Sequence, residues 1–145
     1  MSPQLLWTIA GLVLTVLTLG GVTISSISSM DSATAKLVAS EAGNIGTASK
    51  LWLANTSTTG NFNGITATVV NPFIPDLAVA SGNFASKAAT GVTFAVASTT
   101  PFSEVVITIA NIPAGIESAL TAALTGKSCA ASAIAAGSMT YTCKG

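Results

Sequence analysis

The stretch LLWTIAGLVLTVLTLGGVTI, residues 5–24, decides how the rest of the chain is organised. It contains no Asp, Glu, Lys or Arg, and the first such residue in the chain is Asp31. A helix of about 20 predominantly apolar residues is long enough to cross a bilayer. Because a segment of this kind is not stable in water, it predicts a helix that lies in a membrane or is buried among copies of itself.

The sequence after this segment continues at helical period and becomes amphipathic. Mostly apolar residues recur at steps of three and four along one side, while Lys36 and Lys50 fall on the opposite side. We therefore predict one long helix whose residues 1–26 are hydrophobic and whose residues 27–54 are amphipathic and lead into the head. The stripe consists of Ile27, Met30, Thr34, Val38, Ala42, Ile45, Ala48 and Trp52.

Residues 55–145 predict one small globular head built on an antiparallel sheet. Residues 91–98 and 104–112 are rich in β-branched side chains and alternate at period two, and the TTPFS between them is short enough for a hairpin turn. Residues 113–126 predict a short packing helix, and residues 138–143 predict a last strand. The predicted fold class is α+β, with the long N-terminal helix packed on the sheet.

The two cysteines of the chain, Cys129 and Cys143, lie close together near the C-terminus. An even number of cysteines after an export-type N-terminus favours one disulfide, which would close a C-terminal loop. A metal pair or a redox pair is the alternative. It is disfavoured because the chain has no histidine and the 13 residues between the cysteines do not match a C-x-x-C motif.

The composition argues against catalysis and against nucleic-acid binding. Only 7% of the residues are charged, the formal net charge is zero, and the five lysines are scattered along the chain rather than clustered. The absence of histidine excludes a Ser/His/Asp or Cys/His nucleophile. The five acidic residues do not cluster either, so we interpret each as a solvated surface charge. No P-loop, Rossmann or EF-hand spacing is present, and we predict neither an enzyme nor a cofactor or metal site.

Taken in order, these elements resemble a type IV pilin, and within that family a type IVb-like major pilin in its mature form. The resemblance rests on the oily helix that continues into an amphipathic one, its end at KLWLANTSTTGNFNGI, the NPFIP connection, FSEVVITIANIP before the short helix, and the C-terminal cysteines. The fifth mature position, where the family usually carries Glu, is Leu5 here, next to Gln4.

The resemblance implies a function and a location. The chain is expected to be a structural subunit that polymerises into a pilus-like extracellular filament serving attachment, aggregation, motility or conjugation. Its expected partners are copies of itself, the inner membrane before assembly and the pilus assembly machinery. Met1 would follow a removed leader peptide and would be the site of N-terminal processing and methylation.

The apolar residues of the first segment are the predicted filament core. Gly20 and Gly21 interrupt this core, and they predict either close packing of a neighbouring helix or a point where the helix loosens. The core residues are Leu5, Leu6, Trp7, Ile9, Leu12, Val13, Leu14, Val16, Leu17, Leu19, Val22 and Ile24.

Two other functions fit the same sequence. The chain could be a monomeric membrane-anchored surface or periplasmic binding module, or it could be a related pseudopilin of a secretion system or an archaeal-type filament protein.

Overall fold

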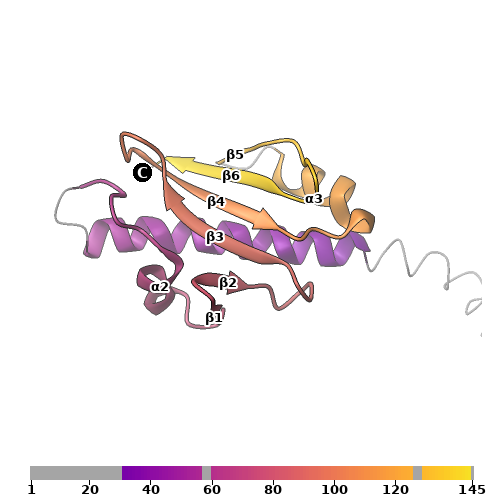
Figure 1. Cartoon of the computed structure of the whole chain (residues 1–145), viewed down its shortest axis with the longest axis horizontal. Helices are drawn as coiled ribbons and strands as arrows, with labels where there is room; N and C mark the ends of the chain where they lie inside the picture. Colours follow the sequence, from indigo (N-terminus) through magenta and orange to yellow (C-terminus); the bar gives the residue numbers. More distant parts are fainter. Residues whose placement is uncertain (1–30, 57–59, 126–128, 145) are drawn as a thin grey trace, which may run out of the picture.

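The computed structural model describes residues 31–56, 60–125 and 129–144 (Figure 1). Residues 31–55 are helical, which confirms the predicted amphipathic helix over this part of its length. The predicted hydrophobic segment, residues 1–26, lies outside the described residues.

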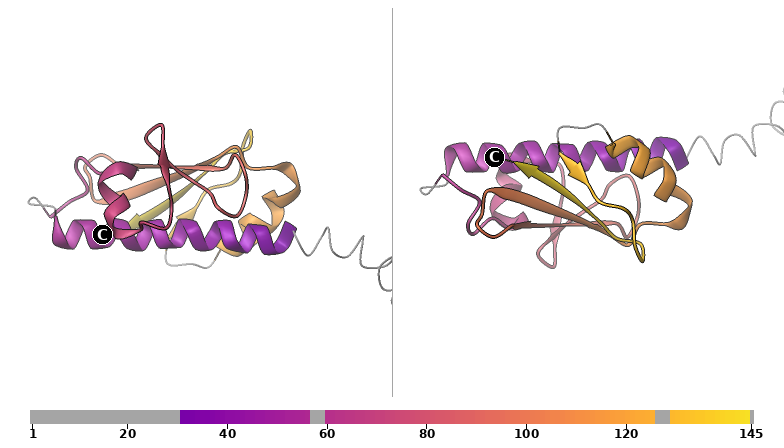
Figure 2. Two further views of the ribbon diagram at one scale, coloured as in Figure 1. Left: turned by 90° about the horizontal axis from the view of Figure 1, so that it is seen from below. Right: turned by 90° about the horizontal axis from the view of Figure 1, so that it is seen from above.

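The long helix (residues 31–55) lies along one face of a six-stranded antiparallel sheet formed within the described residues. Figure 1 looks onto the sheet with the helix behind it, and both views of Figure 2 show the helix along one side of the sheet only. The strand order is β1-β2-β3-β4-β6-β5. The strands are β1 (Val79–Ala80), β2 (Asn83–Ala85), β3 (Thr93–Ser98), β4 (Glu104–Ala110), β5 (Ala130–Ala131) and β6 (Met139–Lys144).

Short helices occupy the connections. After the long helix come α2 (Ala67–Val70) and the 3₁₀ turn η1 (Asn71–Phe73), and the side chain of Thr66 caps α2 by accepting a hydrogen bond from the Val69 amide. Between β4 and β5, the 3₁₀ turn η2 (Ala114–Ile116) leads directly into α3 (Glu117–Leu124). The predicted packing helix is therefore present, although its first turn is 3₁₀ rather than α.

The predicted hairpin is confirmed as β3 and β4, which pair over six positions with Val96 opposite Ile107. On its other side β4 pairs with β6, and Ile107 lies opposite Tyr141. Side chains alternate between the two faces of a strand, so this register places every second residue of each strand on the face covered by the helix.

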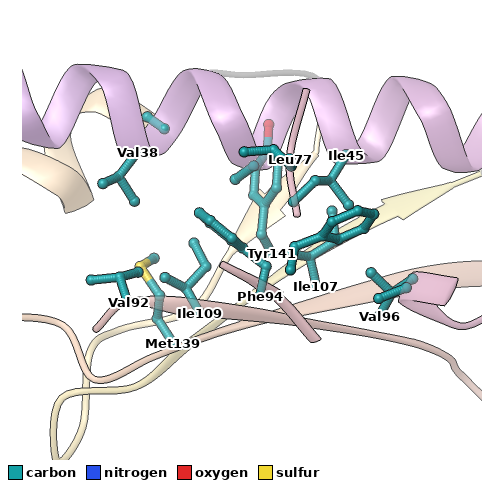
Figure 3. Close-up of a cluster of buried hydrophobic side chains, with 14 of the residues drawn as sticks. Val38, Ile45, Leu77, Val92, Phe94, Val96, Ile107, Ile109, Met139 and Tyr141 are labelled. Carbon is teal, nitrogen blue, oxygen red and sulfur yellow. The ribbon is translucent and has the colours of Figure 1, made fainter. Parts of the chain in front are cut away.

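The core lies between the helix and the central strands. Figure 3 shows Val38 and Ile45 of the helix above Phe94, Ile107 and Ile109 of the sheet, and all five side chains are fully buried. A large apolar side chain buried in this way stabilises the fold by about 1.5–3 kcal/mol relative to its exposed state. The helix is thus held to the sheet mainly by apolar contacts.

The buried face of the helix is wider than the predicted stripe. The stripe residues from Val38 to Trp52 are buried, whereas Thr34 is half-buried and Ile27 and Met30 lie outside the described residues. Four further buried positions lie outside the predicted stripe, because small or polar residues give no hydrophobic signal. These are Ala35, Ala39, Gly46 and Ser49.

The short edge strands were not predicted. β1 and β2 form a hairpin whose turn residues, Ser81 and Gly82, both have positive φ (54° and 80°). This geometry fits a type I′ turn, which matches the twist of the strands it joins. Strands of two or three residues show no measurable period, but the Ser-Gly pair was a usable turn signal.

Candidate assembly surfaces

The residues predicted to assemble the filament lie outside the described part of the chain. They all belong to residues 1–30. They comprise Met1, the filament core between Leu5 and Ile24, and the Gly20–Gly21 pair. Among the described residues, no helix combines the length and the apolar character needed to cross a bilayer. The surfaces that the described chain offers for interaction lie on the helix and the sheet.

The outer helix face is the side of the long helix that points away from the sheet. Its exposed residues include two large apolar side chains, Leu37 (57% exposed) and Leu51 (45% exposed), with Lys36 and Lys50 beside them. Positions spaced by three or four residues lie on one side of a helix. The exposed line runs through Ala33, Leu37, Ser40, Asn44, Thr47, Leu51 and Ala54.

Two grooves flank the outer helix face, and Ser40 and Asn44 border both of them. The larger, of about 610 Å³, lies between the long helix, α3 and β6. The smaller, of about 370 Å³, lies between the helix and the segment around Ile74 and Leu77. The lining of the larger groove is mostly small and polar, with Lys36 as its charged residue.

Tyr141 borders the larger groove on the side of the sheet. Its side chain extends from β6 toward the long helix (Figure 3) and is almost completely buried. Burial disfavours the charged phenolate and raises the pKa of the Tyr141 hydroxyl above its ordinary value of 10.0, while a backbone hydrogen bond with Cys129 acts in the opposite direction. At neutral pH this side chain is an uncharged hydroxyl.

Glu41 ties the long helix to the loop after β2. Its Oε1 accepts a hydrogen bond from the Ser86 hydroxyl (2.7 Å), and its Oε2 accepts one from the Lys87 amide (2.9 Å). The Ser86 oxygen in turn accepts hydrogen bonds from the amides of Ala88 and Ala89, each at 3.1 Å. Glu41 was interpreted as a solvated surface charge, and that interpretation is wrong because both carboxylate oxygens hold the loop.

The disulfide between Cys129 and Cys143 is present and closes the predicted C-terminal loop, with 4.5 Å between the two Cα atoms. Cys143 is fully buried and lies against the long helix at Gly46. A Cβ added at Gly46 would be 3.1 Å from the Cys143 sulfur. The disulfide therefore connects β6 to the segment before β5 and also packs directly on the helix.

The open sheet face is the side of β3, β4 and β6 that points away from the helix. No described helix lies along it in either view of Figure 2. Its side chains alternate with the buried ones and are mostly half-buried Thr, Ala and Val. The residues of this face are Thr93, Ala95, Ala97, Glu104, Val106, Thr108, Ala110, Thr140, Thr142 and Lys144.

The described residues hold no cluster of three or more His, Cys, Asp or Glu side chains that could bind a metal ion. Every buried side-chain nitrogen or oxygen among them has a hydrogen-bond partner. In searches for similar proteins, no family model, no curated protein and no solved structure matches the chain.

Proposed function

We propose that the chain is the structural subunit of a type IV pilus-like extracellular filament, assembled through its N-terminal hydrophobic segment. The observation that carries the proposal concerns the long helix. It packs on the sheet through one face only, and the outer helix face with Leu37 and Leu51 stays exposed along the described length. A helix in this arrangement can extend the apolar sequence of residues 5–24 away from a folded head.

The assembly step follows from the solvent requirements of that apolar segment. In a bilayer, a helix satisfies its backbone polar groups internally and exposes apolar side chains to lipid. In the proposed filament the same segment exchanges lipid for the helices of identical subunits. Transfer of each of its large apolar side chains to water would cost about 1.5–3 kcal/mol of free energy. Subunits would therefore not be released into solution.

The geometry of the polymer follows from its contacts. Head-to-tail contacts between identical subunits that do not close into a ring generate an open helical filament. The inner membrane would hold the subunits before assembly, and the assembly machinery would extract them. The heads, with their nearly uncharged surface, would then form the outside of the filament.

The test is electron microscopy of material sheared from cells, with an antibody against the head. Thin filaments labelled along their length are the expected result. A labelled chain that is found only in detergent-solubilised membranes would support the monomeric binding module instead and would overturn the proposal. Short, non-extending assemblies that remain with the cell envelope would support the pseudopilin.

A further inference from the structure

The two cysteines of the disulfide lie in different surroundings. Cys143 belongs to β6, which pairs with β4 inside the sheet, and it is fully buried. Cys129 directly precedes β5, the strand at the edge of the sheet, and is half-buried. Ala130, the next residue, is exposed. One half of the disulfide therefore lies inside the core, and the other half lies at its boundary.

The long helix covers Cys143. A Cβ at Gly46 would lie 3.1 Å from the Cys143 sulfur, so the helix leaves no room for another molecule at this atom. Ala42 and Ser49, about one turn to either side of Gly46, are fully buried as well. An external thiolate must contact the sulfur that it attacks and displace the other sulfur of the pair. At Cys143 this contact requires the helix to separate from the sheet.

The backbone around Cys129 is held beside β6 by contacts that do not involve sulfur. The Tyr141 hydroxyl forms a hydrogen bond with the backbone of Cys129. The Ser132 amide donates a hydrogen bond to the Thr140 carbonyl (2.9 Å), and the Thr140 amide donates one to the Ser132 hydroxyl (2.9 Å). Because these contacts do not need the bond between the sulfurs, they keep Cys129 near Cys143 as an intramolecular reactant when that bond is open.

We propose that in the folded chain Cys129 is the sulfur that exchanges with external thiols and disulfides, and that Cys143 is the internal thiol that closes the bond. Formation begins when the Cys129 thiol loses its proton to water and the thiolate attacks an external disulfide, RSSR. A mixed disulfide between Cys129 and SR forms, and RS⁻ leaves. The Cys143 thiol then gives up its proton and attacks the Cys129 sulfur, and the remaining RS⁻ leaves. The protein is oxidised by two electrons, and RSSR is reduced to two RSH. Reduction by an external thiol follows the same steps in reverse.

Access and leaving-group chemistry favour different sulfurs. Attack at Cys129 expels Cys143 as a thiolate, whose charge would be desolvated in the apolar core. This cost slows reduction, but it opens no route to Cys143, because the Cys143 sulfur can be reached only through local opening of the helix. The disulfide is therefore expected to be reduced slowly and to be attacked at Cys129.

The first experiment uses the oxidised, full-length wild type in detergent, with reduced glutathione as the attacking thiol. The reaction is quenched with acid, and the protein is denatured and alkylated with N-ethylmaleimide. Chymotrypsin cleaves after Tyr141 and so places Cys129 and Cys143 in different peptides. Mass spectrometry then locates glutathione and maleimide on the two cysteines. The same reaction in concentrated guanidinium chloride is the control.

In the native chain, glutathione should be found on Cys129 at least about tenfold more often than on Cys143, because reaction at Cys143 requires prior local opening. In the denatured chain, the two cysteines should carry glutathione in similar amounts. A native chain with as much glutathione on Cys143 as on Cys129, or with no adduct on Cys129, would overturn the inference.

Two matched variants test the same assignment with a single thiol present. Cys129→Ser and Cys143→Ser both lose the disulfide, so a difference between them reports the position of the remaining thiol. With dithiobis(nitrobenzoate) as the probe, Cys129 should react close to its rate in the denatured chain. Cys143 should react about 100-fold more slowly than in the denatured chain, because only the locally opened state exposes it. Equal slowing of both thiols would contradict the assignment. Circular dichroism checks that both variants fold, and if they do not, the wild-type measurement decides.

The inference does not depend on the proposed filament function, because it concerns the folded head of one subunit. Filaments that form from a chain without preferential reaction at Cys129 would refute the inference alone. Preferential reaction at Cys129 in a chain that forms no filaments would refute the filament function alone.

Discussion

Gly46 of the long helix and Cys143 of β6 lie so close that any side chain at position 46 must meet the disulfide. A Cβ there would lie 3.1 Å from the Cys143 sulfur and 3.9 Å from Cδ1 of Ile107. Glycine in a helix interior costs about 1 kcal/mol relative to alanine. The close approach of the helix to the sheet at this point accounts for the presence of glycine despite that cost.

Gly46→Ala is therefore expected to destabilise the protein, because overpacking a filled core costs about 1–3 kcal/mol and exceeds the gain in helix propensity. Gly43→Ala is the matched control. It lies on the same helix with no atom within 4 Å of the added Cβ, and it should be neutral or stabilising. Thermal unfolding of the detergent-solubilised chain followed by circular dichroism compares the two variants. A G46A protein as stable as G43A would show that the disulfide moves aside freely.

Reduction of the Cys129–Cys143 disulfide should lower the stability by about 3 kcal/mol, the chain-entropy estimate for a loop of this length. A reducing agent is expected to lower the unfolding temperature of the wild type and to leave a Cys129→Ala, Cys143→Ala variant unaffected. Intact mass spectrometry checks the starting state, because the oxidised chain is about two mass units lighter than the reduced one. If alkylation of the denatured, non-reduced protein labels both cysteines, the disulfide is not formed in the native protein.

Glu41→Ala should release the loop that begins at Ser86. The Ser86 hydroxyl and the Lys87 amide then lose their acceptor, which costs about 1–2 kcal/mol of local stability. The chain is well suited to limited proteolysis with trypsin, since it has five lysines and no arginine. Cleavage after Lys87 should accelerate in Glu41→Ala and in Ser86→Ala, whereas cleavage after Lys50 in the helix should not change. Equal rates at Lys87 in the wild type and both variants would show that the carboxylate does not hold the loop.

Tyr141 should link stability to alkaline pH. Its pKa is raised in the folded chain by burial, so the protonated hydroxyl is favoured by folding. Its contribution to the free energy of unfolding is fully present below the pKa of the unfolded chain, which is about 10. This contribution is lost as the pH rises through the higher pKa of the folded chain. Because the chain has a single tyrosine, ultraviolet absorbance of the phenolate reports this group directly.

The expected midpoint for Tyr141 in the native protein lies above that of the protein unfolded in denaturant. Tyr141→Phe keeps the ring and removes the ionisable hydroxyl, so its unfolding free energy should fall less between pH 9 and pH 11 than that of the wild type. Identical midpoints for the native and unfolded chains would contradict the buried position.

Leu14→Lys should abolish filaments, because an unpaired charge in an apolar bundle or in lipid costs several kcal/mol. Leu14→Met is the control, since it conserves volume and apolar character and should leave the filament yield near the wild-type level. Yield is measured by microscopy and immunoblotting of the sheared fraction. A normal yield from Leu14→Lys would mean that residues 5–24 do not form a buried core.

Local periodicity explains which parts of the fold were predictable. The helical stripe from Val38 to Trp52 and the alternation in β3, β4 and β6 depend only on the spacing of apolar residues, and these elements are confirmed. The edge strands were missed because two or three residues show no period. Burial of Ala35 and Ser49 was missed because small and polar side chains carry no hydrophobic signal.

The candidate surfaces were less accessible to sequence reasoning. The composition indicated a nearly uncharged head but could not say where its charges lie. Glu41 was misinterpreted because its partners, Ser86 and Lys87, are 45 and 46 residues away in the chain. A long-range hydrogen bond of this kind leaves no mark in local spacing.

By itself, the sequence determined the α+β class and the helix that leads into a small head, and it favoured the pairing of the two cysteines, because these follow from composition, period and residue count. Only the tertiary structure decided that the disulfide packs on Gly46, that Glu41 holds a loop, and that one face of the sheet is left open. The physical reason is that strand register and the docking of the helix bring together residues far apart in the chain. Those contacts depend on the shape of the assembled layers and not on any local pattern.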